Sequence, residues 1–153
     1  MTTAWRIVLE QWKDTAFSGE GARLSGGRWN TMGTAVVYTS NSLSLAQLEV
    51  LVHAHKRRLL LRWAVCELDI PDEIVTSVDV SLLSQDWTNP RVWSETQQIG
   101  DRWARKNTSA VLRVPSAVSQ VEFNFLLNPL HKDFRRIKIG PFRPFTFDSR
   151  LAK

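Results

Sequence analysis

Glycine is concentrated in one short segment of this chain, and that concentration limits how the first third of the sequence can fold. Five of the seven glycines lie between Ser18 and Gly33. Glycine accepts positive φ angles and close backbone approach, so this density predicts an irregular loop. Residues 35–39 are apolar and β-branched and predict a buried strand. The Ser-Asn-Ser sequence at 40–42 then offers N-cap oxygens for a helix running to about Lys56.

The predicted loop, strand and helix each carry one side chain suited to chemistry. Arg28 ends the loop, Tyr38 lies in the strand, and Glu49 lies on the helix. A site that binds an anionic ligand and breaks a bond with developing positive charge needs a cation, an aromatic ring and a carboxylate. The alternative is a glycine turn, a strand and an amphipathic helix whose Glu49 is solvated, and the pattern alone does not separate the two.

The helix after residue 42 has an apolar pattern of its own. Leu45, Leu48, Val52 and His55 follow i, i+3, i+7, i+10 spacing, so we expect them to share the buried face. Glu49 would then lie on the shoulder of that face, where a carboxylate reaches a cleft while its helix stays packed.

The rest of the chain predicts further short elements. Apolar or alternating runs predict strands over residues 5–9, 59–68, 110–114, 121–127, 135–139 and 142–147. Asn89-Pro90 predicts the start of a helix that continues to about Lys106. Because no internal repeat or linker interrupts the sequence, we expect one compact α+β domain over residues 1–153. Its core would span about residues 5–134, with basic C-terminal strands over 135–153.

Several classes of protein are not supported by the sequence. No apolar run approaches the roughly 20 residues of a membrane span, and no secretion signal opens the chain, so we expect a cytoplasmic protein without a membrane association. The single Cys66 excludes an intramolecular disulfide and any multi-cysteine metal site. His53 and His55 point apart on a helix, so we expect no bound metal. Phosphate-loop, dinucleotide-fold and serine-hydrolase motifs are absent.

The excess of positive over negative charge is confined to the end of the chain. The formal net charge is +5, and residues 132–153 hold seven Lys or Arg against two Asp. With Phe142, Phe145 and Phe147 between these charges, the segment could bind nucleic acid by stacking. The alternative is a charged edge of a sheet with one buried aromatic face.

Four blocks of the sequence, in order, resemble the RES domain family. They read GARLSGGRWN, VVYTSNSLSLAQLEVLVH, VPSAV and EFNFLLNPLH, and the resemblance runs from about Trp5 to about Phe134. The family is named for an arginine, a glutamate and a serine, and it includes toxins of Xre–RES toxin–antitoxin pairs. The resemblance implies a fold like that of ADP-ribosyltransferases, an NAD⁺ cleft, and toxicity through consumption of NAD⁺. It also implies an Xre-type helix-turn-helix antitoxin as partner, with DNA contacted only through that antitoxin.

The family's site residues transfer to matching positions of this chain. The resemblance implies catalytic roles for Glu49, Arg28 and Tyr38. It implies substrate-binding roles for Arg28, Tyr38, Ser116, Asn124 and Asn128, of which the two asparagines would shape the site.

The chemistry of these residue types agrees with NAD⁺ cleavage. Arginine binds phosphate oxygens with a planar fork, as the NAD⁺ pyrophosphate requires. Breaking the nicotinamide–ribose bond spreads positive charge over the sugar, and a fixed carboxylate such as Glu49 stabilises that state. Tyr38 could stack on the pyridinium ring, and Ser116 could donate to a phosphate or to the nicotinamide amide. Water, phosphate or a protein target remain open as the acceptor. A basic nucleic-acid-binding module and a non-catalytic dinucleotide binder remain alternatives.

Overall fold

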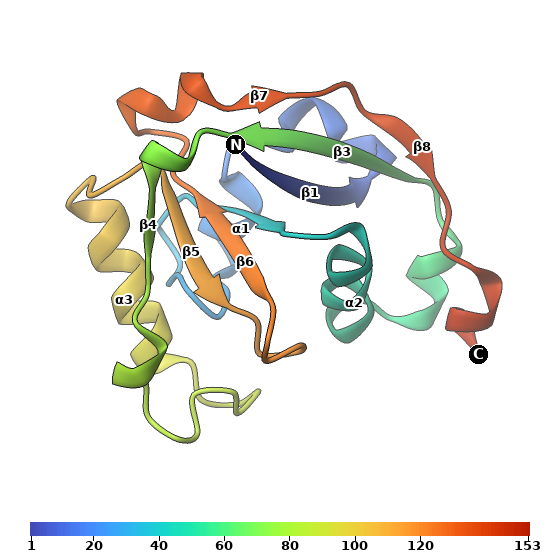
Figure 1. Ribbon diagram of the computed structural model, residues 1–153. Helices are drawn as coiled ribbons and strands as arrows, with labels where there is room; N and C mark the ends of the chain where they lie inside the picture. The colour runs from blue at the N-terminus through green and yellow to red at the C-terminus, as the bar shows by residue number, and fades with distance from the viewer.

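The computed structural model describes residues 1–153 as an α+β domain built on one mixed, curled sheet (Figure 1). The strand order is β4-β5-β6-β2-β1-β3-β7, and β8 pairs with β3. Only β4 and β5 run parallel. The strands are β1 (Thr2–Leu9), β2 (Val37–Ser40), β3 (Trp63–Ile70), β4 (Val75–Ser77), β5 (Val111–Pro115), β6 (Phe123–Leu127), β7 (Lys138–Ile139) and β8 (Arg143–Phe145).

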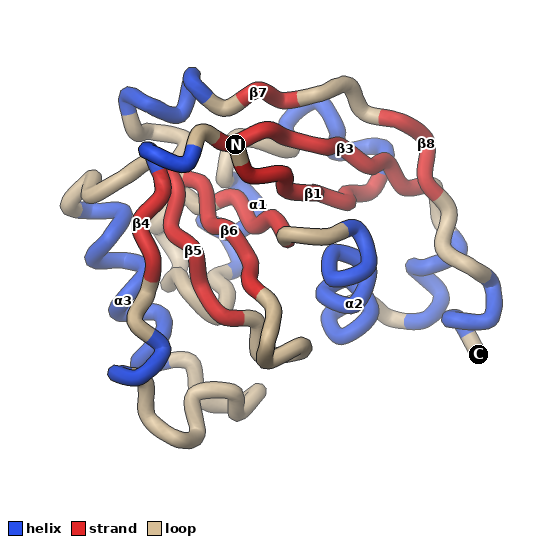
Figure 2. Tube along the Cα trace, viewed as in Figure 1, coloured by secondary structure: helices blue, strands red, loops and turns tan.

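Three α-helices and six short 3₁₀ turns connect the strands (Figure 2). The α-helices are α1 (Glu20–Ser25), α2 (Leu43–His53) and α3 (Ser94–Arg105). The 3₁₀ turns are Glu10–Thr15, Lys56–Leu60, Asp72–Ile74, Val80–Leu82, Lys132–Arg136 and Ser149–Ala152. None of the helices has the length and apolar character needed to span a lipid bilayer.

The curl of the sheet comes from a narrow seam between β1 and β2. These strands share a single residue pair, Trp5 with Ser40, whereas β1 pairs with β3 along its whole length. The half-buried Arg6 fills the seam, donating from Nε to the Ala16 carbonyl at 2.8 Å and from Nη1 to the Tyr38 carbonyl at 2.8 Å. Burial lowers the pKa of Arg6 to about 10, which leaves it charged at neutral pH. One cation thus joins two halves of the sheet that few backbone bonds connect.

Three apolar clusters make up the core, one between the strands of the curled sheet and two between the sheet and the helices α2 and α3. The central one lies inside the curl and includes Ala4, Leu68 and Phe125. A second joins α2 to β1 and β3 around Ala46 and Trp63. The third packs α3 on β5 and β6. In this cluster Gly100 lets α3 lie against the backbone of Trp29, because a Cβ at position 100 would lie 1.7 Å from the Trp29 carbonyl oxygen.

The predicted α+β class and most of the predicted elements are confirmed. The strands predicted over residues 59–68 and 135–139 are shorter than expected, because residues 59–60 and 135–136 belong to 3₁₀ turns and the strands begin only at Trp63 and Lys138. Residues 149–152 at the C-terminus are likewise a 3₁₀ turn and not a strand. The helix α2 has Ser42 as its N-cap but ends at His53, short of Lys56. Its predicted apolar face is wrong, since Leu48 is 40% and Val52 is 55% exposed and His55 lies beyond the helix. Of the predicted positions in the helix only Leu45 is buried, together with its neighbour Ala46, which was not predicted.

The other differences are at α3, α1 and β4. Helix α3 begins at Ser94, not at Asn89, because residues 89–93 form turns of the preceding loop. The glycine-rich segment contains the short helix α1, although its glycines 19, 26 and 33 do adopt positive φ as expected. The parallel strand β4 was not predicted, and two of its three residues are exposed.

Candidate functional site

Glu49 lies at the centre of a hydrogen-bonded group contributed by three separate elements. Its Oε1 accepts from Ser116 Oγ at 3.0 Å and from Asn124 Nδ2 at 2.8 Å. Glu49 projects from α2, Ser116 follows the end of β5, and Asn124 lies near the start of β6. The second carboxylate oxygen makes no hydrogen bond within the protein, and the side chain is half-buried. One oxygen is therefore fixed while the other remains available to a ligand.

Ser116 is held so that its proton points at Glu49. The Ser116 Oγ accepts from the backbone amides of Val118 at 3.2 Å and Ser119 at 3.0 Å. With its acceptor positions occupied by the turn after β5, the fully buried hydroxyl donates to the carboxylate. The serine therefore orients the Glu49 carboxylate and closes the turn at the same time.

Ser40 is a member of this group that the sequence did not identify. Its Oγ donates to Asn124 Oδ1 at 2.8 Å, and the two residues lie directly opposite each other on β2 and β6. Side chains opposite each other on neighbouring antiparallel strands have Cβ atoms about 5 Å apart. The only sequence signal is that Ser40 shares its strand face with Tyr38, two positions earlier.

Arg28 lies near the carboxylate and is bound to a loop. Partial burial lowers the pKa of Arg28, and the nearby Glu49 carboxylate acts in the opposite direction. The guanidinium donates to the carbonyls of Trp87 at 2.7 Å, Thr88 at 3.4 Å and Asn89 at 3.4 Å. These residues belong to the loop that leads into α3, tan in Figure 2. Because the Arg28 guanidinium donates to three carbonyl oxygens, its N–H groups also have the geometry to donate to the oxygen atoms of an anion.

An aromatic side chain from the same loop completes the surroundings of Arg28. The Arg28 guanidinium lies 5.8 Å from the centroid of the Trp93 ring. The Trp93 Nε1 is buried and has no hydrogen-bond partner. Buried donors are normally paired, so this unsatisfied N–H beside the Arg28 side chain is an exception in the structure.

Tyr38 is held by the loop that carries Arg28. Its hydroxyl donates to Asn30 Oδ1 at 2.6 Å and accepts from the Trp29 amide at 3.1 Å. Burial raises the pKa of Tyr38, so the phenol stays protonated. Gly27 allows the approach, because a Cβ there would lie 2.7 Å from the Tyr38 hydroxyl. Because both hydroxyl contacts are internal, any contact with a ligand would use the ring.

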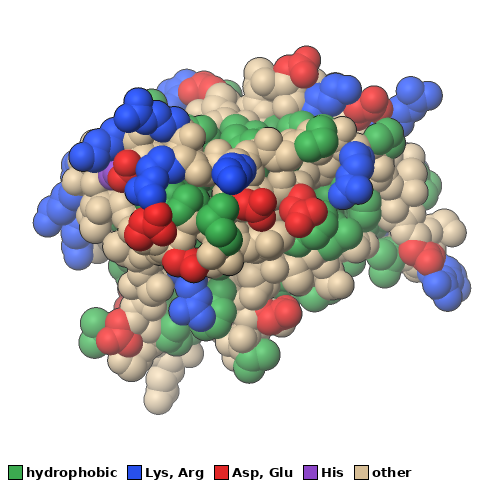
Figure 3. Space-filling model, turned by 45° about the horizontal axis from the view of Figure 1, so that its top comes forward, with side chains coloured by type: hydrophobic (Ala, Val, Ile, Leu, Met, Phe, Trp, Pro, Cys, Tyr) green, Lys and Arg blue, Asp and Glu red, His purple; other side chains and the backbone are tan.

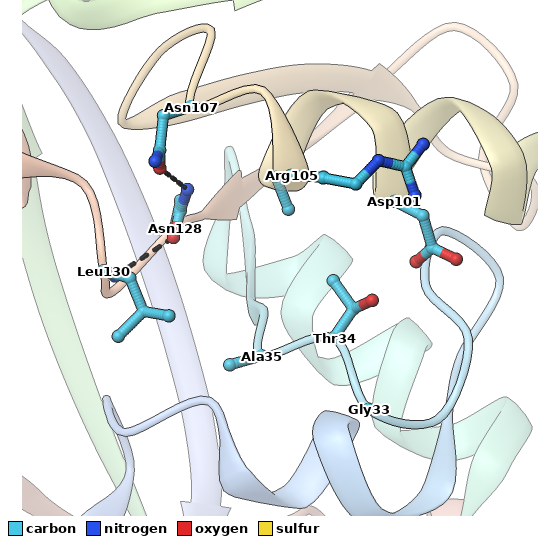
Figure 4. A pocket seen from close by; sticks show the side chains of 9 residues that line it. Gly33, Thr34, Ala35, Asp101, Arg105, Asn107, Asn128 and Leu130 are labelled. Atoms are coloured by element: carbon cyan, nitrogen blue, oxygen red, sulfur yellow. Dashed lines mark hydrogen bonds between the residues drawn. The ribbon is translucent and has the colours of Figure 1, made fainter.

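Asn128 is not part of this group. It follows the opposite end of β6, four residues from Asn124, which corresponds to about 13 Å along a strand. Its Nδ2 donates to Asn107 Oδ1 at 3.0 Å, and its Oδ1 accepts from the Leu130 amide at 3.0 Å (Figure 4). These bonds lie beside a pocket of about 390 Å³ whose wall includes Thr34 and Arg105. That pocket is separate from Glu49, and the structure gives Asn128 a role in holding its loop.

Other groups of the chain do not converge on Glu49. No three His, Cys, Asp or Glu side chains are grouped so that they could hold a metal ion. On the face that carries β7, Lys and Arg side chains alternate with Asp and Glu side chains (Figure 3). Phe147 is buried, and Phe142 and Phe145 pack partly buried against the core clusters. The C-terminal aromatic rings therefore face inward and do not form a stacking surface.

Comparison with known proteins identifies the family. The model of the RES domain matches residues 3–148. A protein of Photorhabdus laumondii named Toxin Res is 40% identical over 97% of this chain and 96% of its own length. A protein of Sphingobium named Prs ADP-ribosylating toxin is 35% identical over 100% of this chain and 99% of its own length.

A solved structure shares the fold. The crystal structure of the M. tuberculosis MbcT–MbcA toxin–antitoxin complex contains a chain that matches with a TM-score of 0.79. The match covers 99% of this chain and 86% of that one, at 20% identity. The family model matches nearly the whole chain, and three relatives are at least 34% identical over nearly their whole length. The chain therefore belongs to the RES domain family.

Proposed function

We propose that this protein is a toxin that consumes NAD⁺ by cleaving the bond between nicotinamide and ribose. The observation that carries the proposal is the fixed carboxylate of Glu49, with one oxygen held by Ser116 and Asn124 and the other unengaged. The name of the Sphingobium relative supports the reaction class, since an ADP-ribosylating enzyme takes ADP-ribose from NAD⁺.

Glu49 would act on the charge that develops during the reaction. As the nicotinamide leaves, the ribose acquires oxocarbenium character, and a negative group beside it lowers the energy of that state more than that of the substrate. Two donors on one oxygen fix the carboxylate before the reaction begins. A preorganised charge of this kind needs no reorientation at the transition state.

Arg28 and its surroundings fit a dinucleotide. The guanidinium holds three carbonyl oxygens, so phosphate oxygens could replace them with the same donor geometry. Trp93 adds an unpaired N–H beside this cation. We therefore propose that Arg28 binds the pyrophosphate. Because the hydroxyl of Tyr38 is already hydrogen-bonded, we propose that the face of its ring stacks on the nicotinamide.

The partner we propose is an Xre-type helix-turn-helix antitoxin that covers the Glu49 site in the cytoplasm. The similarity of fold to a chain from a toxin–antitoxin complex and the Toxin Res names of relatives support a toxin with a cognate inhibitor. A purified complex should consume NAD⁺ more slowly than the free protein, and equal rates would contradict the blocking model.

Proton NMR of NAD⁺ incubated with the purified protein tests the reaction. The incubation is run with and without phosphate, beside a Glu49→Ala variant and a Glu67→Gln control on the exposed side of β3. Release of nicotinamide by wild type and Glu67→Gln, but not by Glu49→Ala, is the expected result. The ribosyl product then separates hydrolysis from phosphorolysis.

A negative result also has a defined meaning. If NAD⁺ stays intact in both buffers, a lysate is added to supply a protein acceptor. If NAD⁺ still persists while it raises the melting temperature of the protein, the chain is a binder and not an enzyme.

A further inference from the structure

We propose that Ser40 is a positioning residue for Glu49, which it controls through the side-chain amide of Asn124. This inference rests on the proposed function, because it assigns a role in the same site. The three side chains form a relay in which Ser40 donates to Asn124 Oδ1 at 2.8 Å and Asn124 Nδ2 donates to Glu49 Oε1 at 2.8 Å.

The asparagine amide has two ends of similar shape and opposite hydrogen-bonding character. Packing alone does not select between them, so the neighbouring groups set the orientation. An ionised Glu49 accepts only, and it therefore requires the NH₂ end of Asn124. That choice turns the amide oxygen toward the interior, where Asn124 is only 9% exposed.

Ser40 supplies the donor that this oxygen needs. Ser40 is 4% exposed, and its hydroxyl is the group that the structure pairs with Asn124 Oδ1. Without it the amide oxygen would lack a donor in a buried setting, a condition that proteins avoid. The amide would then rotate toward other partners, and Glu49 would lose one of the two donors that fix it.

The neighbouring residue provides a matched control. Thr39 is 3% exposed, and its hydroxyl donates to the Phe125 carbonyl at 2.9 Å. Because successive strand residues point to opposite faces, Thr39 lies on the face of β2 away from Asn124. Thr39→Val and Ser40→Ala each remove one buried hydroxyl bond from the same strand, and only the second touches the relay.

The experiment compares steady-state NAD⁺ cleavage by wild type, Thr39→Val, Ser40→Ala, Asn124→Ala and the double variant Ser40→Ala/Asn124→Ala. We expect Ser40→Ala to lower kcat about 10-fold, the equivalent of about 1.4 kcal/mol in the barrier, with KM changed less than about twofold. Thr39→Val should keep kcat within about twofold at a similar melting temperature. The double variant should be no slower than Asn124→Ala, since residues that act as one unit are not additive.

A second readout does not depend on turnover. The side-chain amide signals of Asn124 in a ¹⁵N spectrum should shift in Ser40→Ala and stay in place in Thr39→Val. If Ser40→Ala folds poorly, Ser40→Cys replaces the hydroxyl by a slightly larger and weaker donor and should lower kcat in the same direction by a smaller factor.

Failure of this inference is distinct from failure of the proposed function. Equal kcat in Ser40→Ala and Thr39→Val, or an unmoved Asn124 amide signal, overturns the role of Ser40. Absence of cleavage by wild type, both alone and with lysate, overturns the proposed function, and the amide signals then still decide whether Ser40 orients Asn124.

Discussion

Replacing Glu49 by glutamine removes one charge from the site and leaves its shape in place. The new side chain keeps an oxygen that accepts from Ser116 and Asn124, the two donors now on Oε1. We therefore expect the free energy of unfolding to change by only about 1 kcal/mol, the net value of a typical hydrogen bond. The variant isolates the electrostatic contribution of the carboxylate.

The loss in rate follows from Coulomb's law. Two unit charges about 4 Å apart at an effective dielectric constant of about 20 interact by about 4 kcal/mol. At about 1.4 kcal/mol per factor of ten, a full charge would correspond to about 10³ in rate. The half-exposed position of Glu49 and the partial charge on the sugar reduce the effect, so we expect kcat to fall about 10²-fold.

The assay is nicotinamide release at saturating NAD⁺, with melting temperatures measured on the same preparations. Glu67→Gln makes the same chemical change at an exposed position of β3 and should leave kcat unchanged. A folded Glu49→Gln protein with kcat within about twofold of wild type would refute the electrostatic argument.

Three further outcomes follow from the structure. Arg28→Lys should raise KM for NAD⁺ about 10-fold in steady-state assays, because lysine keeps the charge but cannot donate two parallel hydrogen bonds as the guanidinium does. An unchanged KM would show that Arg28 does not bind the pyrophosphate. Gly100→Ala should lower the melting temperature by about 10 °C or more, or prevent folding, since the new Cβ would lie 1.7 Å from the Trp29 carbonyl oxygen. A melting curve like that of wild type would contradict the close contact between α3 and Trp29. Cys66 should not react with a thiol-specific disulfide reagent in the native protein and should react on unfolding, because it is 1% exposed and burial raises the pKa of its thiol. The reaction is measured by absorbance, and rapid labelling of the native protein would contradict the buried position of Cys66.

The sequence predicted those parts of the fold that local pattern controls. The opening strand, the N-cap at Ser42 and the positive φ angles in the glycine-rich segment follow from residue type. The apolar face of α2 did not follow, because the helix buries Leu45, packs Ala46 in a cluster with Ile7 and Leu9 of β1, and leaves Leu48 exposed. Tertiary contacts overrode the periodicity there.

The candidate site was only partly accessible from the sequence for a different reason. Glu49 is 67 residues from Ser116 and 75 residues from Asn124, so no local pattern reports that the three meet. They were singled out by the family resemblance, and the same resemblance also included Asn128, which lies at the other end of β6. Ser40 required the register of β2 against β6, which only the structure provides.

The hydrogen bonds of Arg28 have a consequence for which substitutions the loop of residues 87–89 can accept during evolution. Its three partners are peptide carbonyls of residues 87–89, and a carbonyl is present whichever side chain the residue carries. A substitution at one of these positions should therefore leave the Arg28 contacts in place as long as the backbone keeps its path. That path is shaped by turn residues such as Asn89, whose side chain accepts from the Arg91 amide at 2.9 Å. Selection on this part of the molecule should thus act on loop length and turn formation, and an invariant arginine would face a variable segment.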